Sequence, residues 1–154
     1  MKIIFLQTGG TIDKDYKANK KNHGYNFEIH KPAVKFILHA LKPKFKYKIL
    51  TVCKKDSLYL TDNDRQRILH QCQKIKAKKI IITHGTDTFK KTAEQLSQIT
   101  DKAIILTGAM VPARFVDTDA IFNIGVAIGA INNIKNGVYI SIGGITYPWD
   151  DYNP

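Results

Sequence analysis

The sequence has no long hydrophobic run and only two cysteines. No apolar stretch approaches the roughly 20 residues of a membrane-spanning helix, and the opening residues M-K-I-I-F-L-Q are too short for a secretory signal. We therefore expect a cytoplasmic protein without membrane contact. Cys53 and Cys72 match no metal-binding or redox spacing, and in the cytoplasm isolated cysteines are normally reduced. The five histidines form no metal-ligand pattern either, so we predict no metal and no cofactor.

Arginine is also scarce, although the chain is strongly basic. The formal net charge is +11, from 24 lysines and arginines against 13 acidic residues, and only three of the basic residues are arginines. The lysines are spread over most of the chain, and aromatic residues do not alternate with them as base-stacking platforms would require. A solvated, lysine-rich surface is therefore favoured, and nucleic acid is not the expected partner. Contact with a polyanion remains the alternative.

The 154 residues are enough to bury a real core, so we treat residues 1–154 as a single domain. Apolar and β-branched runs alternate with stretches whose apolar residues recur at helical spacing. Strands are predicted at 2–7, 47–52, 79–83, 103–107 and 137–142, and helices at 31–41, 61–77, 86–99 and 117–134. Residues 8–26 are predicted to form a loop, and residues 143–154 to be irregular.

Strands that alternate with helices predict an α/β fold. The expected architecture has three layers: an open parallel sheet of about five strands with helices on both faces, of the Rossmann or flavodoxin kind. In such sheets ligands bind beyond the carboxyl ends of the strands. The segments after the five predicted strands are T-G-G-T, K-K-D-S, H-G-T-D-T, G-A-M-V-P and G-G. Small, hydroxyl-bearing and carboxylate residues therefore gather at that edge.

Two of these segments have both a structural and a chemical interpretation. T-G-G-T at residues 8–11 fits a tight turn after a strand, but it also fits a threonine nucleophile beside backbone N–H donors. In H-G-T-D-T at residues 84–88, Thr86 or Asp87 fits a helix N-cap. The same two residues also fit a second hydroxyl and an ammonium-binding carboxylate that face the first threonine. No nucleotide-binding glycine fingerprint is present.

Together the motifs resemble a known family. In this order, T-G-G-T-I, D-S, H-G-T-D-T and T-G-A-M-x-P are similar to the amino-terminal domain of bacterial-type L-asparaginases, from Lys2 to about Trp149. T-G-G-T-I and H-G-T-D-T, roughly 75 residues apart, form a highly specific pair. The resemblance implies an amidohydrolase that releases ammonia from L-asparagine or L-glutamine through a threonine nucleophile and an acyl-enzyme.

The resemblance also implies roles for individual residues. Thr11 would be the nucleophile and Thr86 the second catalytic threonine. Tyr25 would be the assisting tyrosine of the loop, with Tyr16 as the weaker match. The substrate-binding residues would be Gly10, Asp56, Ser57, Asp87, Ala109 and Met110.

Within this set the resemblance distinguishes several tasks. Ser57 would bind the α-carboxylate of the amino-acid substrate and Asp87 its α-ammonium group. Asp119 and Asn123 would support this edge of the sheet. Candidate amide donors to the developing oxyanion are Gly10, Thr11 and Ala109.

Two features depart from the family pattern. The place of the family's activating lysine falls near Pro154, and no lysine follows Lys135. Three alternatives stay open: the lysine is lost, it lies just beyond Pro154, or Lys14, Lys17 or another subunit supplies the amine. The family's carboxy-terminal domain has no counterpart in these residues, as in short, stand-alone versions of the amino-terminal domain. We expect a homodimer or higher homo-oligomer.

Three functional hypotheses follow. The first is an asparaginase-type amidohydrolase. The second is a module that binds asparagine or aspartate without turnover, which the missing lysine favours. The third is the amidase part of a tRNA-dependent amidotransferase, which uses a related domain; the basic charge favours it, and the missing appended domains count against it.

Overall fold

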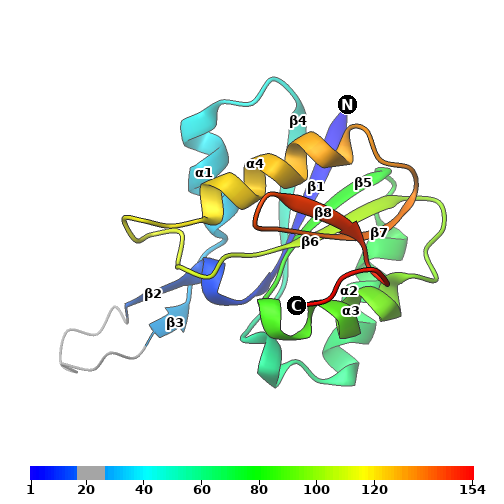
Figure 1. Ribbon diagram of the computed structural model, residues 1–154, viewed down its shortest axis with the longest axis horizontal. Helices are drawn as coiled ribbons and strands as arrows, with labels where there is room; N and C mark the ends of the chain where they lie inside the picture. The colour runs from blue at the N-terminus through cyan, green and yellow to red at the C-terminus, as the bar shows by residue number, and fades with distance from the viewer. Residues whose placement is uncertain (17–26) are drawn as a thin grey trace.

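The computed structural model describes residues 1–16 and 27–154, and a six-stranded sheet forms its centre (Figure 1). The strand order is β4-β1-β5-β6-β7-β8; the first five strands run parallel and β8 is antiparallel to β7. The predicted α/β fold is confirmed. The strands are β1 (Lys2–Gly9), β4 (Lys46–Lys55), β5 (Lys79–Thr83), β6 (Ala103–Thr107), β7 (Gly137–Ile142) and β8 (Ile145–Pro148).

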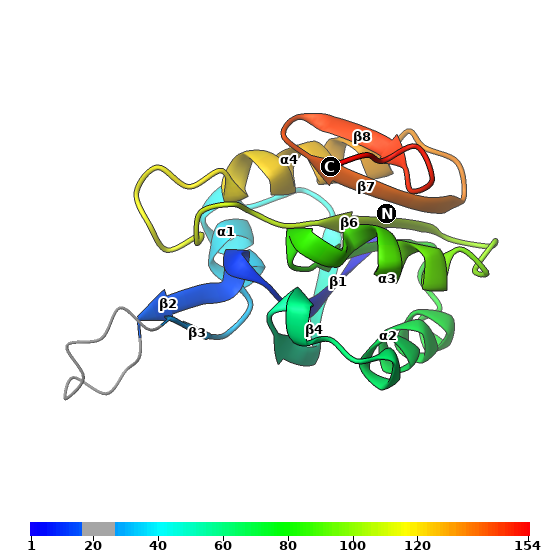
Figure 2. The same cartoon turned by 60° about the horizontal axis from the view of Figure 1, so that its bottom comes forward.

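Helices cover both faces of this sheet, as the sequence predicts (Figure 2). Because successive side chains of a strand point to opposite faces, Ile4 and Leu6 pack beneath α2 and α3, whereas Ile3 and Phe5 pack beneath α1 and α4. In the described part of the chain, no helix is long and apolar enough to cross a membrane. The helices are α1 (Ala33–Leu41), α2 (Asp62–Lys74), α3 (Phe89–Leu96) and α4 (Ala120–Ile131).

Three local expectations were wrong. The segment predicted to be irregular contains β8, because Gly143 and Gly144 have φ of 60° and 90° and form the tight turn of a hairpin with β7. The segment predicted as a loop contains a 3₁₀ turn, η1 (Thr11–Asp13), and β2 (Lys14–Tyr16), which pairs with β3 (Phe27–Ile29). The helix expected from residue 86 begins as a 3₁₀ turn, η3 (Thr86–Thr88), before α3.

The strand order places a topological switch point between β1 and β5. From β1 the chain crosses to β4 on one side, and the next strand of the sheet, β5, lies on the other side of β1. The connections therefore diverge at the carboxyl ends of these two strands, where α/β sheets bind ligands. T-G-G-T ends β1 and H-G-T-D-T follows β5, so both motifs lie at this point.

The start of α2 provides a test of the local structure. Thr61 Oγ1 accepts a hydrogen bond from Asp64 N at 3.1 Å, and Asp64 Oδ2 accepts one from Thr61 N at 2.9 Å, which is a capping box. We predict that Thr61→Ala lowers the free energy of unfolding by about 1 kcal/mol in urea titrations, because helix N–H groups lose their acceptor. Thr61→Ser keeps the acceptor and should lose less. Equal losses in the two variants would contradict this role.

Candidate active site

The first feature of the site is a direct backbone contact between the T-G-G-T and H-G-T-D-T loops. Gly10 has φ of 84°, a conformation that residues with a Cβ rarely adopt. A Cβ on Gly10 would also lie 2.6 Å from Gly85 Cα and overlap Gly85 N. The Gly10 N–H donates to Lys55 O at 3.0 Å, so β4 holds the same turn from the other side.

Gly85 also lies against a third loop, the segment after β4 that contains Ser57. A Cβ on Gly85 would lie 2.6 Å from Ser57 Oγ, where the 3₁₀ turn η2 (Ser57–Tyr59) begins. Ser57 is 1% exposed, and its hydroxyl has no hydrogen-bond partner among the described residues. Buried hydroxyls normally have a partner, and leaving one without costs roughly 1–3 kcal/mol. Ser57 Oγ is therefore a polar group that a ligand could satisfy.

The two threonines that the sequence singles out have different surroundings. Thr11 opens η1 directly after the glycine contact and is partly exposed, and its hydroxyl makes no hydrogen bond to a described residue. Thr86 lies across the glycine contact, with its Oγ1 3.9 Å from Met110 Sδ. Thr8 is the structural threonine of the first motif, because its buried Oγ1 donates to Thr83 O at 2.8 Å.

A hollow of about 380 Å³ borders Thr86. It combines the carboxylate of Asp87 with the apolar side chains of Met110 and Tyr152. Sequence reasoning missed Tyr152, whose burial to 8% exposure follows from packing against Phe89. The residues that line the hollow are Thr86, Asp87, Met110, Ile142, Tyr152 and Pro154.

The segment after β6 is fixed by the two residues expected to support it. The Asp119 carboxylate accepts hydrogen bonds from the N–H groups of Met110 and Val111, each at 3.0 Å. Asn123 Nδ2 donates to Gly108 O at 3.0 Å and to Asp119 Oδ2 at 2.9 Å. Asp119 and Asn123 thus hold the backbone around Ala109, which is 2% exposed.

The chemistry depends on whether a lysine lies near Thr86. Pro154, where the family lysine was expected, lines the hollow beside Thr86. Lys14 is engaged elsewhere: its Nζ lies 2.7 Å from Asp56 Oδ2, and this hydrogen bond lowers the pKa of Asp56. Lys17, like the predicted assisting residue Tyr25, lies outside the described residues.

The weaker candidate for the assisting tyrosine, Tyr16, lies at the end of β2. It is 57% exposed and packs against two other rings, Phe27 and Phe115, with centroids 5.3 and 5.5 Å away. No described contact joins Tyr16 to Thr11. Within the described ranges, no group of three or more His, Cys, Asp and Glu residues is placed to hold a metal ion.

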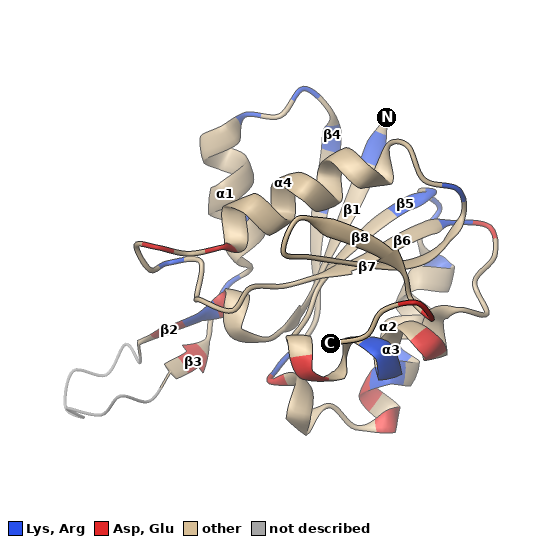
Figure 3. Ribbon diagram, viewed as in Figure 1, with Lys and Arg blue, Asp and Glu red and all other residues tan. Residues whose placement is uncertain are grey.

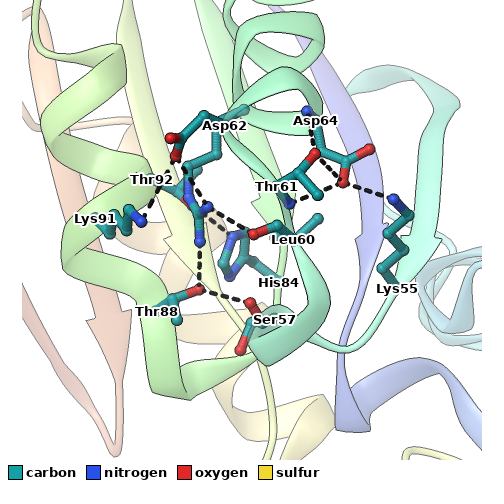
Figure 4. Close-up of polar contacts among 11 residues, drawn as sticks. Lys55, Ser57, Leu60, Thr61, Asp62, Asp64, His84, Thr88, Lys91 and Thr92 are labelled. Atoms are coloured by element: carbon teal, nitrogen blue, oxygen red, sulfur yellow. Dashed lines mark hydrogen bonds and ion pairs between the residues drawn. The ribbon is translucent and has the colours of Figure 1, made fainter.

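A buried arginine supports the loops of the site, and Figure 4 labels its hydrogen-bond partners Leu60, Thr88 and Thr92. Arg65 of α2 is 2% exposed and donates to Leu60 O at 2.8 Å and to the hydroxyls of Thr88 and Thr92 at 3.2 Å. Thr88 in turn donates to Ser57 O at 3.2 Å. One cation therefore joins η2, η3 and α3 under the three loops.

Sequence reasoning missed Arg65, although a signal was present. It stands three residues before Ile68, on the same helical stripe as the apolar side chains that face the core. His84 completes the network, with its Nε2 2.8 Å from Thr92 Oγ1. Burial lowers the pKa of His84 to about 4, so its ring is neutral at pH 7 and only a weak base.

Asp13 is a buried carboxyl group beside the proposed nucleophile. Its Oδ1 accepts a hydrogen bond from Ala33 N at the start of α1, at 2.7 Å, and its Oδ2 has no partner among the described residues. Asp13 is 0% exposed, and burial raises its pKa to about 6. The folded chain therefore binds this proton more tightly than the unfolded chain does.

The contribution of Asp13 to the free energy of unfolding should consequently fall as the pH rises from about 4 to 6, while Asp13 ionises in the folded state. The buried, neutral His84 contributes with the opposite sign over this range, so the effect of Asp13 is measured as the difference between the wild type and a variant. We predict that Asp13→Asn removes up to about 3 kcal/mol of this pH dependence and stabilises the protein at pH 8 relative to the wild type. Urea unfolding at pH 4 and pH 8 measures the effect. Exposed Asp117→Asn is the control, and an unchanged pH dependence in Asp13→Asn would contradict the account.

Comparison with known proteins identifies the family of this chain. The family model for the amino-terminal domain of asparaginase matches residues 2–147. The chain is 31% identical to L-asparaginase 2 of Escherichia coli (strain K12) over 131 residues, which are 79% of the chain and 36% of that protein. It is 30% identical to a glutamyl-tRNA(Gln) amidotransferase subunit of Methanococcus maripaludis (strain C5 / ATCC BAA-1333) over 148 residues, 94% of the chain and 35% of that protein.

Solved structures show the same relationship. The thermostable L-asparaginase from Thermococcus kodakarensis superimposes with a TM-score of 0.77 at 26% identity, and the match covers 92% of this chain and 44% of that one. The chain thus spans less than half of that structure and about a third of the two relatives above. From the match over residues 2–147, the chain belongs to the asparaginase family and corresponds to its amino-terminal domain.

Proposed function

We propose that this chain hydrolyses the side-chain amide of L-asparagine, or of L-glutamine, with Thr11 as the nucleophile. The observation that carries the proposal is the contact of three loops through Gly10, Gly85 and Ser57 at the switch point of the sheet. Relatives named L-asparaginase support the substrate class. We also propose a homo-oligomer, because Met110 at the rim of the hollow is 69% exposed and a second subunit would cover it.

Substrate binding follows from the charges of an amino acid. The Ser57 hydroxyl, which has no partner among the described residues, would donate a hydrogen bond to the α-carboxylate, and the exposed Asp87 carboxylate would accept one from the α-ammonium group. The side-chain amide would then point toward Thr11. Such positioning of reacting atoms can contribute several kcal/mol to catalysis.

Chemistry would proceed in two steps. Thr11 Oγ1 attacks the amide carbon, and amide N–H donors, with Ala109 as a candidate, stabilise the oxyanion. The C–N bond breaks, and the leaving nitrogen takes up the proton lost by Thr11 and departs as ammonia. Water then attacks the ester, which frees the acid product and restores the Thr11 hydroxyl. Thr86 would relay the protons.

We predict that Thr11→Ala lowers ammonia release from L-asparagine by about a thousandfold or more, because no nucleophile remains. Thr86→Val should lower kcat by about 10²–10⁴, the usual contribution of proton transfer. A coupled ammonia assay measures both, and Thr100→Ala, at an exposed position away from the pocket, is the matched control. Full activity in Thr11→Ala would refute Thr11 as the nucleophile.

A second candidate function is amino-acid binding without turnover. The specific observation is that Pro154, rather than a lysine, lines the hollow at Thr86, and no lysine of the described chain bonds to the Thr86 hydroxyl. This alternative predicts calorimetric binding of L-aspartate, weakened at least about tenfold in Asp87→Ala but not in Asp117→Ala, with no ammonia release by the wild type. Measurable ammonia release that depends on Thr11 would exclude it.

A further inference from the structure

A sizeable hollow lies at the opposite end of the sheet from the candidate active site. Its volume is about 680 Å³, and it opens between the carboxyl end of α2 and the amino ends of β1, β4 and β5. Its apolar floor includes Ile4, Leu50 and Ile75. The lysines that border it are Lys2, Lys48, Lys76, Lys78 and Lys79. We call this feature the lysine groove.

Most lysines of the lysine groove have no acidic partner among the described residues. No carboxylate lines it, and among its lysines only Lys78 forms an ion pair within the described chain, with Asp101 at 2.6 Å. A second hollow adjoins it at Met1 and adds Lys44 and Lys46 beside the ring of Phe45. Figure 3 shows this concentration of basic residues at the amino ends of β1, β4 and β5.

The need to prevent pairing of the edge strand with other chains explains only some of the lysines at the lysine groove. β4 is an edge strand, and lysines on such strands commonly prevent pairing with other chains. Lys76 and Lys78, however, lie in the connection between α2 and β5, and Lys79 begins an interior strand. In addition, Lys2 and Lys46 are register partners on neighbouring strands, where like charges repel. An anionic ligand would relieve this repulsion.

We propose that the lysine groove binds single-stranded nucleic acid. A concave shape suits a chain of phosphates better than the flat surface of a membrane does. The lysines on its walls would contact phosphates, and the half-buried Leu50 of its floor, with Phe45 of the adjoining hollow, would contact the faces of unpaired bases. The lysine groove is separate from the candidate active site, so the proposal does not depend on amidase activity.

Sequence spacing did not indicate this surface, because its lysines come from β1, β4 and the α2–β5 connection. In the linear sequence they are dispersed, and aromatic residues do not alternate with them. The parallel sheet brings the amino ends of distant strands to one edge and collects the charges there. Part of the +11 net charge is therefore concentrated at the lysine groove. A local excess of positive charge attracts polyanions over long distances.

The test is fluorescence anisotropy with a labelled oligothymidylate of about 20 nucleotides, between roughly 50 and 200 mM salt. We expect saturable binding, and the double variant Lys48→Glu/Lys76→Glu should weaken it by about tenfold or more. The slope of log K against the logarithm of the salt concentration should become smaller in magnitude by about one to two. Lys35→Glu/Lys91→Glu makes the same change in net charge on α1 and α3, away from the groove, and should lose at most about twofold.

Several results would overturn the proposal. These are the absence of saturable binding at low salt, equal losses in the two double variants, and a duplex of the same length that binds as tightly as the single strand. Binding to phosphatidylserine vesicles without binding to the oligonucleotide would instead identify a membrane surface. Circular dichroism checks that each variant is folded, and Lys48→Gln/Lys76→Gln replaces the glutamate pair if that pair does not fold.

Discussion

The close approach of Gly10 and Gly85 is the constraint on which the candidate site depends. Any side chain on Gly10 would overlap the backbone at Gly85, and any side chain on Gly85 would overlap Ser57. With hydrogen atoms in these positions, the loops after β1, β4 and β5 reach one another across the switch point. The loops that carry Thr11, Ser57 and Thr86 are thereby brought together, although these residues are far apart in the sequence. The two glycines are therefore as important to this site as the hydroxyls beside them.

Two kinds of polar group surround that contact, and they have opposite roles. Arg65 and His84 lie in the interior with hydrogen bonds to neighbouring groups, so they fix the loops, and the neutral His84 ring is only a weak base. Among the described residues, Ser57 Oγ has no hydrogen-bond partner although it is buried, and the Thr11 hydroxyl makes no hydrogen bond. A site that combines a rigid support with unsatisfied groups at its surface is prepared for a polar ligand.

Sequence patterns predicted the layers of the fold because buried parallel strands and amphipathic helices have clear periodicities. β8 was not predicted, because two consecutive glycines such as Gly143 and Gly144 are also common in irregular segments. Residues Ile145–Pro148 form a strand because they pair with β7. Motif residues indicated the site but not its support, because Arg65 belongs to no motif and only its place on the buried stripe of α2 distinguishes it from a surface arginine. The lysine groove is likewise a product of folding, because its charges come from separate strands.

A crystal structure of the Thr11→Ala variant soaked with L-asparagine tests the central claim most directly. The account predicts the amino acid at the glycine contact, with its α-carboxylate at Ser57 Oγ, its ammonium group at Asp87 and its amide carbon facing residue 11. An amino acid bound elsewhere, or bound here with its amide turned away from residue 11, would contradict the account. An empty site at a saturating concentration of L-asparagine would contradict it as well.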